Sequence, residues 1–313
     1  MEQNFLQVLG ENTAGDPMRE GVKWTHLTRH QISLKLAERG TPAGKRVVKQ
    51  LLQKHGYVKR KARKVKAMGP RHPDRNAQFE NIARLRKEYL EAGDPVLSVD
   101  AKKKELLGNF YREGKLYAQQ PIEVFDHDFP GAAVGAVYPH GIYDLGRNCG
   151  HINLGTSHET SEFACDSIAQ WWENYGRAQY PQATKLLLLC DGGGSNSASR
   201  YVFKEELQKL ADRLGLEIRV AHYPPYCSKY NPIEHRLFPH VTRACQGVVF
   251  HTVQIVKSLM ENTQTRTGLR VTVDVIDKAY ELGRKCSQGF KKTMKIIFDD
   301  FLPKWNYRVL PQN

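Results

Sequence analysis

Apolar residues from position 95 onward alternate between short uninterrupted runs and stretches with helical spacing. The runs at 95–99 and 185–190 have the length of strands, and the second is apolar after its first residue. A continuous apolar run of this length indicates a strand covered on both faces. We expect strands at 95–99, 132–143, 151–154, 185–190 and 217–221, with helices at 160–175, 197–214 and 232–242. This order predicts an α/β protein with a mixed sheet and helices on its faces.

The chain before this alternation has a different pattern. Residues 1–22 are polar and rich in turn formers, which predicts a linker or arm. Within 23–74, two short runs of helically spaced apolar residues are separated by Thr-Pro-Ala-Gly at 41–44. Two short helices joined by such a turn predict a helix-turn-helix, with an ordinary helical hairpin as the alternative. One more helix is expected at 75–91.

The remaining boundaries follow from weaker signals. The segment at about 102–131 is charged and poorly periodic, so we expect an insertion between the first two strands of a domain that spans 75–249. Residues 250–313 are expected to be a mostly helical C-terminal extension that packs on the sheet or contacts DNA.

Charge is concentrated near the N-terminus. The formal net charge is +14, and residues 1–90 hold 20 Lys and Arg against 8 Asp and Glu. Such asymmetry favours a polyanionic partner for this part of the chain. The candidate DNA-binding residues flank the second short helix or form the basic run after it: Lys45, Arg46, Lys49, Lys54, Lys59, Arg60, Lys61, Arg63, Lys64 and Lys66. A solvated, flexible connector is the alternative interpretation of the basic run.

Several protein classes are disfavoured. The six cysteines are widely spaced with no Cys-x-x-Cys pair, which disfavours a zinc site or a disulfide framework and fits a reducing cytoplasm. There is no signal-peptide pattern and no apolar run long enough to span a membrane. A P-loop, a His-Glu-x-x-His motif and a Gly-x-Ser-x-Gly elbow are also absent from the sequence. We expect a soluble cytoplasmic protein, associated with the nucleoid, that makes no membrane contact.

Three acidic residues carry the candidate chemistry. Asp100 and Asp191 end the two apolar runs, and Glu234 lies where a helix begins. Three carboxylates brought together can hold two divalent cations beside a phosphodiester, with Asp100 suited to the bridging place. Each acid has an alternative role: Asp100 in ending a strand, Asp191 in the turn before Gly192-Gly-Gly194, and Glu234 in a capping box whose N-cap is Asn231.

Two histidines lie near the predicted acids in the sequence. His222 ends the strand expected at 217–221, and His235 follows Glu234 directly. A helical histidine is more often a surface or packed residue than a ligand, so both are secondary candidates.

Seven sequence blocks resemble the ISAzo-type insertion-sequence transposases, and the last is also similar to Tc/mariner-type enzymes. The blocks are SVDAKKKELLGNF at 98–110, HDF at 127–129, GIYD at 141–144, SHET at 157–160, CDGGGSN at 190–196, HYPP at 222–225 and KYNPIEHRLF at 229–238. The resemblance implies an RNase H-like fold and a D-D-E triad at Asp100, Asp191 and Glu234. Its expected cofactors are two Mg²⁺ or Mn²⁺ ions.

The resemblance also implies partners and further site residues. The reaction is cleavage at transposon ends followed by joining of the 3′-hydroxyl to target DNA, so terminal repeats and target DNA are the expected partners. A homodimer or larger assembly is expected because two ends must be held. His158, Asn196 and Arg200 are further candidates for orienting metal ligands or DNA.

Two alternatives to a transposase remain open. A nuclease of the same fold would cleave without strand transfer, and an inactive remnant or regulator would bind DNA without cleavage. Members of the family generally have a longer N-terminus with another helical DNA-binding unit, so this chain is expected to be a truncated copy, a sequence with a misassigned start, or one part of a split reading frame.

Overall fold

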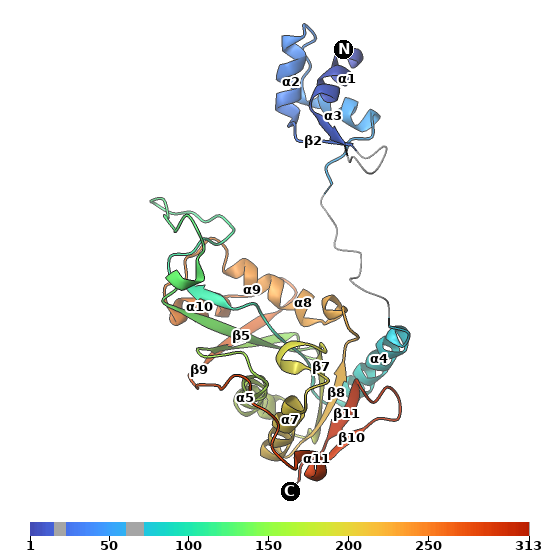
Figure 1. Ribbon diagram of the computed structural model, residues 1–313, viewed down its shortest axis with the longest axis vertical. Coiled ribbons are helices and arrows are strands. Elements are labelled where there is room, and N and C mark those ends of the chain that lie inside the picture. The colour runs from blue at the N-terminus through green and yellow to red at the C-terminus, as the bar shows by residue number, and fades with distance from the viewer. Residues whose placement is uncertain (16–22, 61–71, 313) are drawn as a thin grey trace. The chain divides into compact units, whose positions relative to one another are not determined.

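The computed structural model describes residues 1–15, 23–60 and 72–312. The chain forms two compact units, Met1–Lys66 and Ala67–Asn313, which are treated separately below (Figure 1). In the described residues, no helix is long and apolar enough to cross a membrane.

The N-terminal unit contains three helices around one small core. The helices are α1 (Glu2–Glu11), α2 (Arg29–Glu38) and α3 (Lys45–Lys54), and a two-stranded sheet pairs β1 (Thr13–Gly15) with β2 (Lys23–Thr25). The helices α2 and α3 lie where the helix-turn-helix was predicted, and Thr28 with Gln31 forms a capping box at the start of α2.

The expectation of a linker or arm over 1–22 is wrong for its first half. Phe5, Val8 and Leu9 of α1 are buried together with Ile32 of α2 and Val48 of α3. These three apolar residues occupy one side of a short helix, and the other two helices supply the surface that covers it.

In the described part of the second unit, nine strands form one sheet. Its order is β10-β11-β8-β7-β3-β5-β6-β9, and β4 pairs with β5 beside this path. The strands are β3 (Val96–Ala101), β4 (Glu105–Leu107), β5 (Gly135–Asp144), β6 (Cys149–Gly155), β7 (Lys185–Cys190), β8 (Glu217–His222), β9 (Arg270–Ile276), β10 (Ile296–Phe298) and β11 (Asn306–Val309). The strands β3, β7 and β8 are parallel, whereas β5 is antiparallel to β3.

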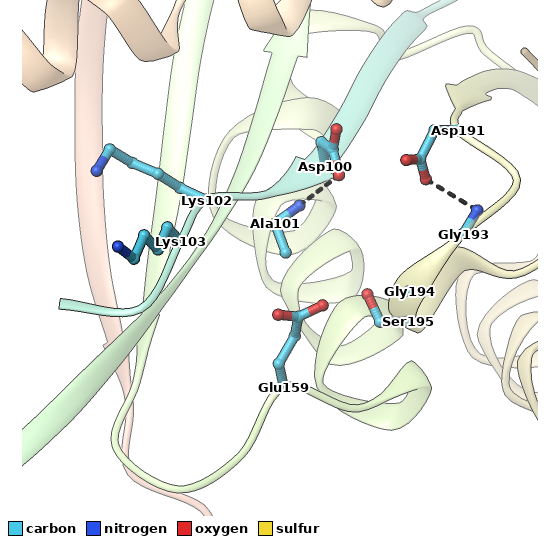
Figure 2. Close-up of a pocket in the computed structure, with 9 residues that line it drawn as sticks. All are labelled: Asp100, Ala101, Lys102, Lys103, Glu159, Asp191, Gly193, Gly194 and Ser195. Carbon is cyan, nitrogen blue, oxygen red and sulfur yellow. Dashed lines mark hydrogen bonds between the residues drawn. The ribbon is translucent and has the colours of Figure 1, made fainter. Parts of the chain in front are cut away.

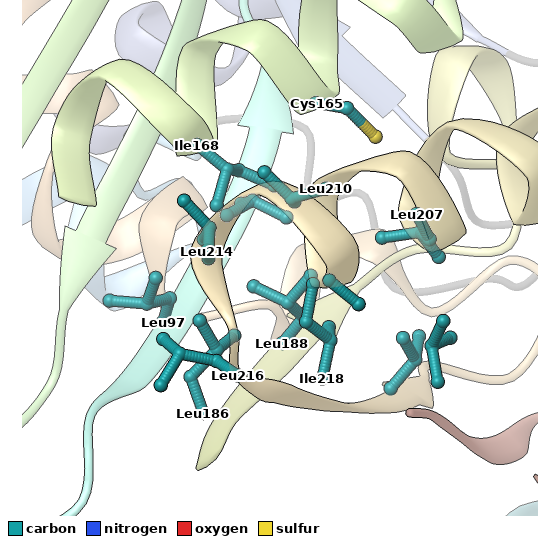
Figure 3. Packing of buried hydrophobic residues seen from close by; sticks show 14 of the residues in the cluster. Leu97, Cys165, Ile168, Leu186, Leu188, Leu207, Leu210, Leu214, Leu216 and Ile218 are labelled. Atoms are coloured by element: carbon teal, nitrogen blue, oxygen red, sulfur yellow. The ribbon is translucent and has the colours of Figure 1, made fainter. Parts of the chain in front are cut away.

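Helices cover both faces of this sheet. They are α4 (Arg75–Ala92), α5 (Ser161–Trp171), α6 (Arg177–Gln179), α7 (Tyr201–Leu214), α8 (Ile233–Arg236), α9 (Phe238–Ala244), α10 (Val253–Glu261) and α11 (Phe290–Thr293). Leu186 and Leu188 of β7 pack with α5 and α7, as Figure 3 shows, whereas Leu187 and Leu189 pack with α4 on the other face. The predicted α/β class, a mixed sheet flanked by helices, is confirmed.

The prediction of a helical extension over 250–313 is wrong. Only α10 and α11 are helical in the described part of this region, and β9, β10 and β11 are strands of the main sheet. In β9, Val271 and Val273 are buried while Arg270 and Thr272 are exposed, a period of two that indicates a strand. The domain boundary expected at 249 therefore cuts through one sheet.

Three smaller differences concern element boundaries. The helix expected at 160–175 continues from α5 through a π-helical turn at Trp172–Gly176 into α6. The helix expected at 232–242 divides into α8 and α9 at Leu237. The insertion at about 102–131 contains the short strand β4, which pairs with β5.

Candidate active site

Asp100 and Asp191 come together because the strands that carry them are parallel neighbours. Asp100 is the next-to-last residue of β3, and Asp191 directly follows β7. Since β3 pairs with β7 in parallel, the carboxyl ends of the two strands meet at one edge of the sheet. Both residues line a polar cavity of about 150 Å³, together with Ala101, Lys102, Lys103, Glu159, Gly193, Gly194 and Ser195.

Carboxylates dominate this cavity. Figure 2 shows Asp100, Asp191 and Glu159 pointing toward a common space from three separate segments, whereas Lys102 and Lys103 point away from it. Lys102 instead forms an ion pair with Glu105, which Arg112 also contacts. The negative charge at the edge of the sheet is therefore not neutralised by these lysines.

The environment of Asp100 favours the protonated carboxyl. Burial raises the pKa of Asp100 to about 8, and the carboxylates of Asp191, Glu234 and Glu159 act in the same direction. The backbone N–H of Ala101 donates to Asp100 at 2.8 Å and opposes this shift. Burial also raises the pKa of Asp191, and the N–H of Gly193 opposes it.

Glu234 lies on α8, which side-chain hydrogen bonds fix against β3. The buried hydroxyl of Ser98 donates to Oδ1 of Asn231 at 2.5 Å and accepts from the backbone N–H of Ile233 at 2.9 Å. Nδ2 of Asn231 donates to the carbonyl of Val99 at 3.3 Å. The helix that carries Glu234 is thus held by the two residues that precede Asp100 in β3.

The capping box predicted for Asn231 and Glu234 is not formed. The N-cap of α8 is Pro232, without a side-chain capping bond, and the side chain of Asn231 contacts β3 instead. Glycine at 141 permits close packing on the same face, because a Cβ there would lie 2.6 Å from the Phe238 ring. Glu234 is not among the residues that line the cavity, although its charge acts on Asp100.

His222 holds the backbone of Asp191 from behind the cavity. Its Nδ1 lies 2.9 Å from the carbonyl oxygen of Asp191, and its Nε2 lies 3.0 Å from the hydroxyl of Tyr307. A carbonyl can only accept, so Nδ1 carries the proton and Nε2 accepts from Tyr307. Burial lowers the pKa of His222 to about 4, which agrees with this neutral tautomer.

The other histidine candidates lie outside the cavity lining. His158 makes a 3.1 Å contact from Nδ1 to the carbonyl of Tyr280, and His235 contacts the carbonyl of Lys229. Asn196 is buried, and its Oδ1 has no hydrogen-bond partner among the described residues. Arg200 is exposed at the N-cap of α7. Roles for these four residues stay predictions.

The candidate DNA-binding residues belong to the N-terminal unit. In the described part of the chain, Lys45, Arg46 and Lys49 are exposed on α3, and Lys54 pairs with Glu2 at 2.7 Å. The following basic residues divide into two groups: Lys59 and Arg60 are described and exposed, whereas Lys61, Arg63, Lys64 and Lys66 lie outside the described residues.

Glu159 is a cavity residue that sequence reasoning missed. It lies between β6 and α5, directly before Thr160, whose side chain caps α5. The block SHET at 157–160 had been singled out, but His158 was selected from it. The position of an acid between a strand and a helix, as for Asp191, was the signal that would have identified Glu159.

The residues at this edge fit a hard divalent cation. Asp100, Asp191 and Glu159 offer carboxylate oxygens, the donors that Mg²⁺ and Mn²⁺ prefer, beside a cavity open to phosphate oxygens and water. A cation would also stabilise the ionised carboxyl of Asp100, whose pKa is raised by burial and by the neighbouring carboxylates. Across residues 1–15, 23–60 and 72–312, no group of three or more His, Cys, Asp or Glu residues is arranged tightly enough to hold a metal ion alone.

Comparison with known proteins gives a family and a distant structural likeness. The family model described as "Rhodopirellula transposase DDE domain" matches residues 4–311. None of the curated protein sequences matches the chain. The solved "Mos1 transposase paired-end complex with left transposon end" has 14% identity and a TM-score of 0.45, over 82% of this chain and 69% of that chain. The "pre-cleavage Mos1 transpososome" has 13% identity and a TM-score of 0.45 over the same shares.

Proposed function

The chain belongs to the DDE transposases of the Rhodopirellula type, metal-dependent enzymes that cleave DNA and transfer strands, and we propose that Asp100, Asp191 and Glu234 are its catalytic carboxylates. The observation that carries this assignment is the meeting of Asp100 and Asp191 in one cavity, with α8 and its Glu234 fixed to the same strand. Strand and helix ends place the three side chains on rigid elements, as precise chemistry requires.

The expected cofactor is a pair of Mg²⁺ or Mn²⁺ ions. The carboxylates of Asp100, Asp191 and Glu234 would hold these ions, with waters and phosphate oxygens as further ligands. Bound there, the pair would activate the attacking water or 3′-hydroxyl and stabilise the leaving oxygen. His222 fixes the backbone at Asp191, and Ser98 with Asn231 fixes the start of α8, so the protein positions the carboxylates before substrate binds.

The substrate assignment follows from the family and the charge distribution. We assign the element's terminal repeats and target DNA as the substrates, bound in part by the exposed Lys45, Arg46 and Lys49 of α3. A homodimer or larger assembly on DNA, at the nucleoid, would hold the two ends for joining.

The assignment is tested by nicking of DNA that carries the element's own terminal repeats, with Mg²⁺ or Mn²⁺. Wild type is compared with Asp191→Asn, which keeps the side-chain shape, and with Asp128→Asn, an exposed carboxylate away from the cavity. We expect nicking that leaves a 3′-hydroxyl by wild type and Asp128→Asn, and none by Asp191→Asn.

The products separate the alternative functions. Joining of the 3′-hydroxyl to a second DNA supports a transposase, whereas nicking without joining supports a nuclease of the same fold. Binding without nicking by wild type contradicts the assignment and supports an inactive remnant.

A further inference from the structure

The loop between β8 and α8 lies at the same edge of the sheet as the candidate carboxylates. It leaves the carboxyl end of β8, which is parallel to β7, and leads to the helix that carries Glu234. The N–H of Tyr223 donates to the carbonyl of Cys190 at 2.8 Å, and the side chain of Asn231 binds β3. Both ends of this loop are therefore attached to the strands that carry Asp100 and Asp191.

Tyr226, in the middle of this loop, combines a strained backbone with an exposed ring. Its φ is +60°, in the left-handed region that bulky residues rarely adopt, and its side chain is 69% exposed. A glycine would take this conformation without strain. Strained residues at a functional edge persist where the surrounding structure enforces them, and they point to a functional constraint.

The neighbouring residues hold the loop in this conformation. Cys227 is buried, its thiol accepts from Nε of Arg75 at 3.3 Å, and its N–H donates to the carbonyl of Pro224 at 3.2 Å. The N–H of Tyr230 donates to the carbonyl of Cys227 at 2.9 Å. The Tyr226 ring is thus presented to solvent by a loop that is fixed before and after it.

The second exposed tyrosine of the loop is already engaged. Tyr230 packs edge-on against Phe79 at 5.2 Å between ring centroids, with Arg75 at 5.4 Å and Lys229 at 5.1 Å from its ring. Within the described ranges, Tyr226 makes no hydrogen bond, ring contact or cation contact of this kind. Its ring is therefore available to a ligand. Lys229 belongs to the same loop, and Arg75 at the start of α4 contacts Cys227 of that loop.

We propose that Tyr226 is a stacking platform for an unpaired nucleobase of the DNA strand at the active site, with the exposed Lys229, three residues further along the same loop, contacting a phosphate of that strand. Exposed aromatic rings in positively charged grooves bind single-stranded DNA in this way, with little sequence preference because every base has a π-face. This inference rests on the proposed function, since it places the base next to the phosphodiester that the carboxylates act on.

The test measures DNA binding without catalysis, in buffer with EDTA. The probes are a duplex with a short 3′ single-stranded overhang that contains 5-iodouracil, and the blunt duplex of the same sequence. Wild type should bind the overhang duplex more tightly, and Tyr226→Ala should lose about tenfold in affinity for that probe alone. Tyr226→Phe should keep the affinity, because it keeps the ring.

Two further variants separate stacking from folding. Tyr226→Gly removes the backbone strain, so its melting temperature should rise while its preference for the overhang disappears. Tyr117→Ala removes an exposed tyrosine of the segment 102–131 and should change neither property. Photo-cross-linking of the iodouracil should attach the DNA to Tyr226 in the wild type.

Each outcome decides the proposal. Overhang preference retained by Tyr226→Gly, or cross-links that map to other residues only, would overturn it. If wild type binds both probes equally but nicks DNA in an Asp191-dependent manner, the platform is wrong and the proposed function stands. If wild type binds neither probe, both are contradicted.

Discussion

The hydroxyl of Ser98 donates a 2.5 Å hydrogen bond to the side-chain oxygen of Asn231, a residue 133 positions away in the chain. Both side chains are fully buried. The bond joins the strand that carries Asp100 to the start of the helix that carries Glu234, so two of the three proposed catalytic acids depend on one buried polar contact.

Replacing Ser98 with alanine tests this contact. The change leaves Oδ1 of Asn231 and the N–H of Ile233 without their partner, which should lower the free energy of unfolding by about 1–3 kcal/mol. Nicking should fall more than DNA binding, because Glu234 loses its fixed position. Thermal melting and nicking assays measure both, with the exposed Ser228→Ala as the control. Unchanged stability and unchanged nicking would refute the anchoring role.

Asp100→Asn should stabilise the metal-free protein while abolishing nicking. Burial and the carboxylates of Asp191, Glu234 and Glu159 raise the folded-state pKa of Asp100 from 3.8 to about 8. The folded state then binds more protons than the unfolded state between these values, so Asp100 destabilises the fold increasingly as pH rises from 4 to 8. At pH 8 in EDTA the variant should be more stable by on the order of 2 kcal/mol.

Chemical denaturation across this pH range checks the Asp100 prediction. The advantage of Asp100→Asn should shrink toward pH 4, and the exposed Asp128→Asn should show no such dependence. A stability difference that does not vary with pH would contradict the raised pKa of Asp100 in the folded protein.

Removing the buried His140 should protect the fold at mildly acidic pH. Burial lowers the pKa of His140 to about 3, and neither ring nitrogen has a partner among the described residues. Below the unfolded-state value of 6.5 the unfolded chain gains a proton that the folded chain does not, so stability present above pH 6.5 is lost as pH falls. His140→Phe should therefore be more stable than wild type at pH 5, by about 2 kcal/mol at most.

The comparison for His140 is made by denaturation at pH 7.5 and pH 5. The exposed His127→Gln serves as the control, and it should follow the wild-type curve. If His140→Phe and wild type lose the same stability between pH 7.5 and pH 5, other groups cause that loss. Among them are His151 and His222, whose pKa values burial lowers to about 4.

Tyr307→Phe should impair the candidate active site indirectly, through His222. The variant removes the hydroxyl that donates to Nε2 of His222, so the ring no longer has a fixed tautomer to hold the carbonyl of Asp191. We expect a weaker dependence of melting temperature on added Mn²⁺ and a slower nicking rate, with DNA affinity unchanged. Tyr201→Phe is the matched control. Equal Mn²⁺ responses in wild type and Tyr307→Phe would limit Tyr307 to a packing role.

Charge removal on α3 should change the salt dependence of DNA binding. Each of Lys45→Gln, Arg46→Gln and Lys49→Gln should lower the slope of log affinity against log salt by about 0.9 if the residue contacts a phosphate. Lys87→Gln, on the exposed side of α4, should leave the slope unchanged. If the three α3 variants have the same slope as the wild type and Lys87→Gln, the residues that contact DNA lie outside α3.

The sequence predicted most accurately the elements whose own residues show a clear pattern of apolar and polar positions. The strand at 185–190 was predicted with its observed bounds, because a run buried on both faces has no polar interruption. The strands β10 and β11 were missed, since three or four residues carry little pattern and their partners lie far away in the chain. The meeting of Asp100 with Asp191 required only the expectation of neighbouring parallel strands.

Asn231 shows why the rest of the site could not be predicted. Its spacing from Pro232 and Glu234 is that of a capping box. The sequence around Asn231 does not indicate that its side chain binds a residue in a distant strand instead. The structure uses the same amide for Ser98, because a buried hydroxyl and a buried amide each require a partner. Glu159 follows a strand as Asp191 does, but which edge of the sheet the end of β6 reaches depends on the pairing of β6 with β5 and of β5 with β3.

The strand β11 lies near the C-terminus, so it is synthesised after the strand β8 with which it pairs. The strand lies between β8 and β10, and the carbonyl of Trp305 accepts from the N–H of His222 at 2.9 Å. While the ribosome still holds residues 305–309, β8 has a bare edge and His222 lacks its Tyr307 partner. A nascent chain can fold its earlier segments during translation, but the contacts that hold the backbone of Asp191 through His222 are complete only when this late strand emerges and pairs.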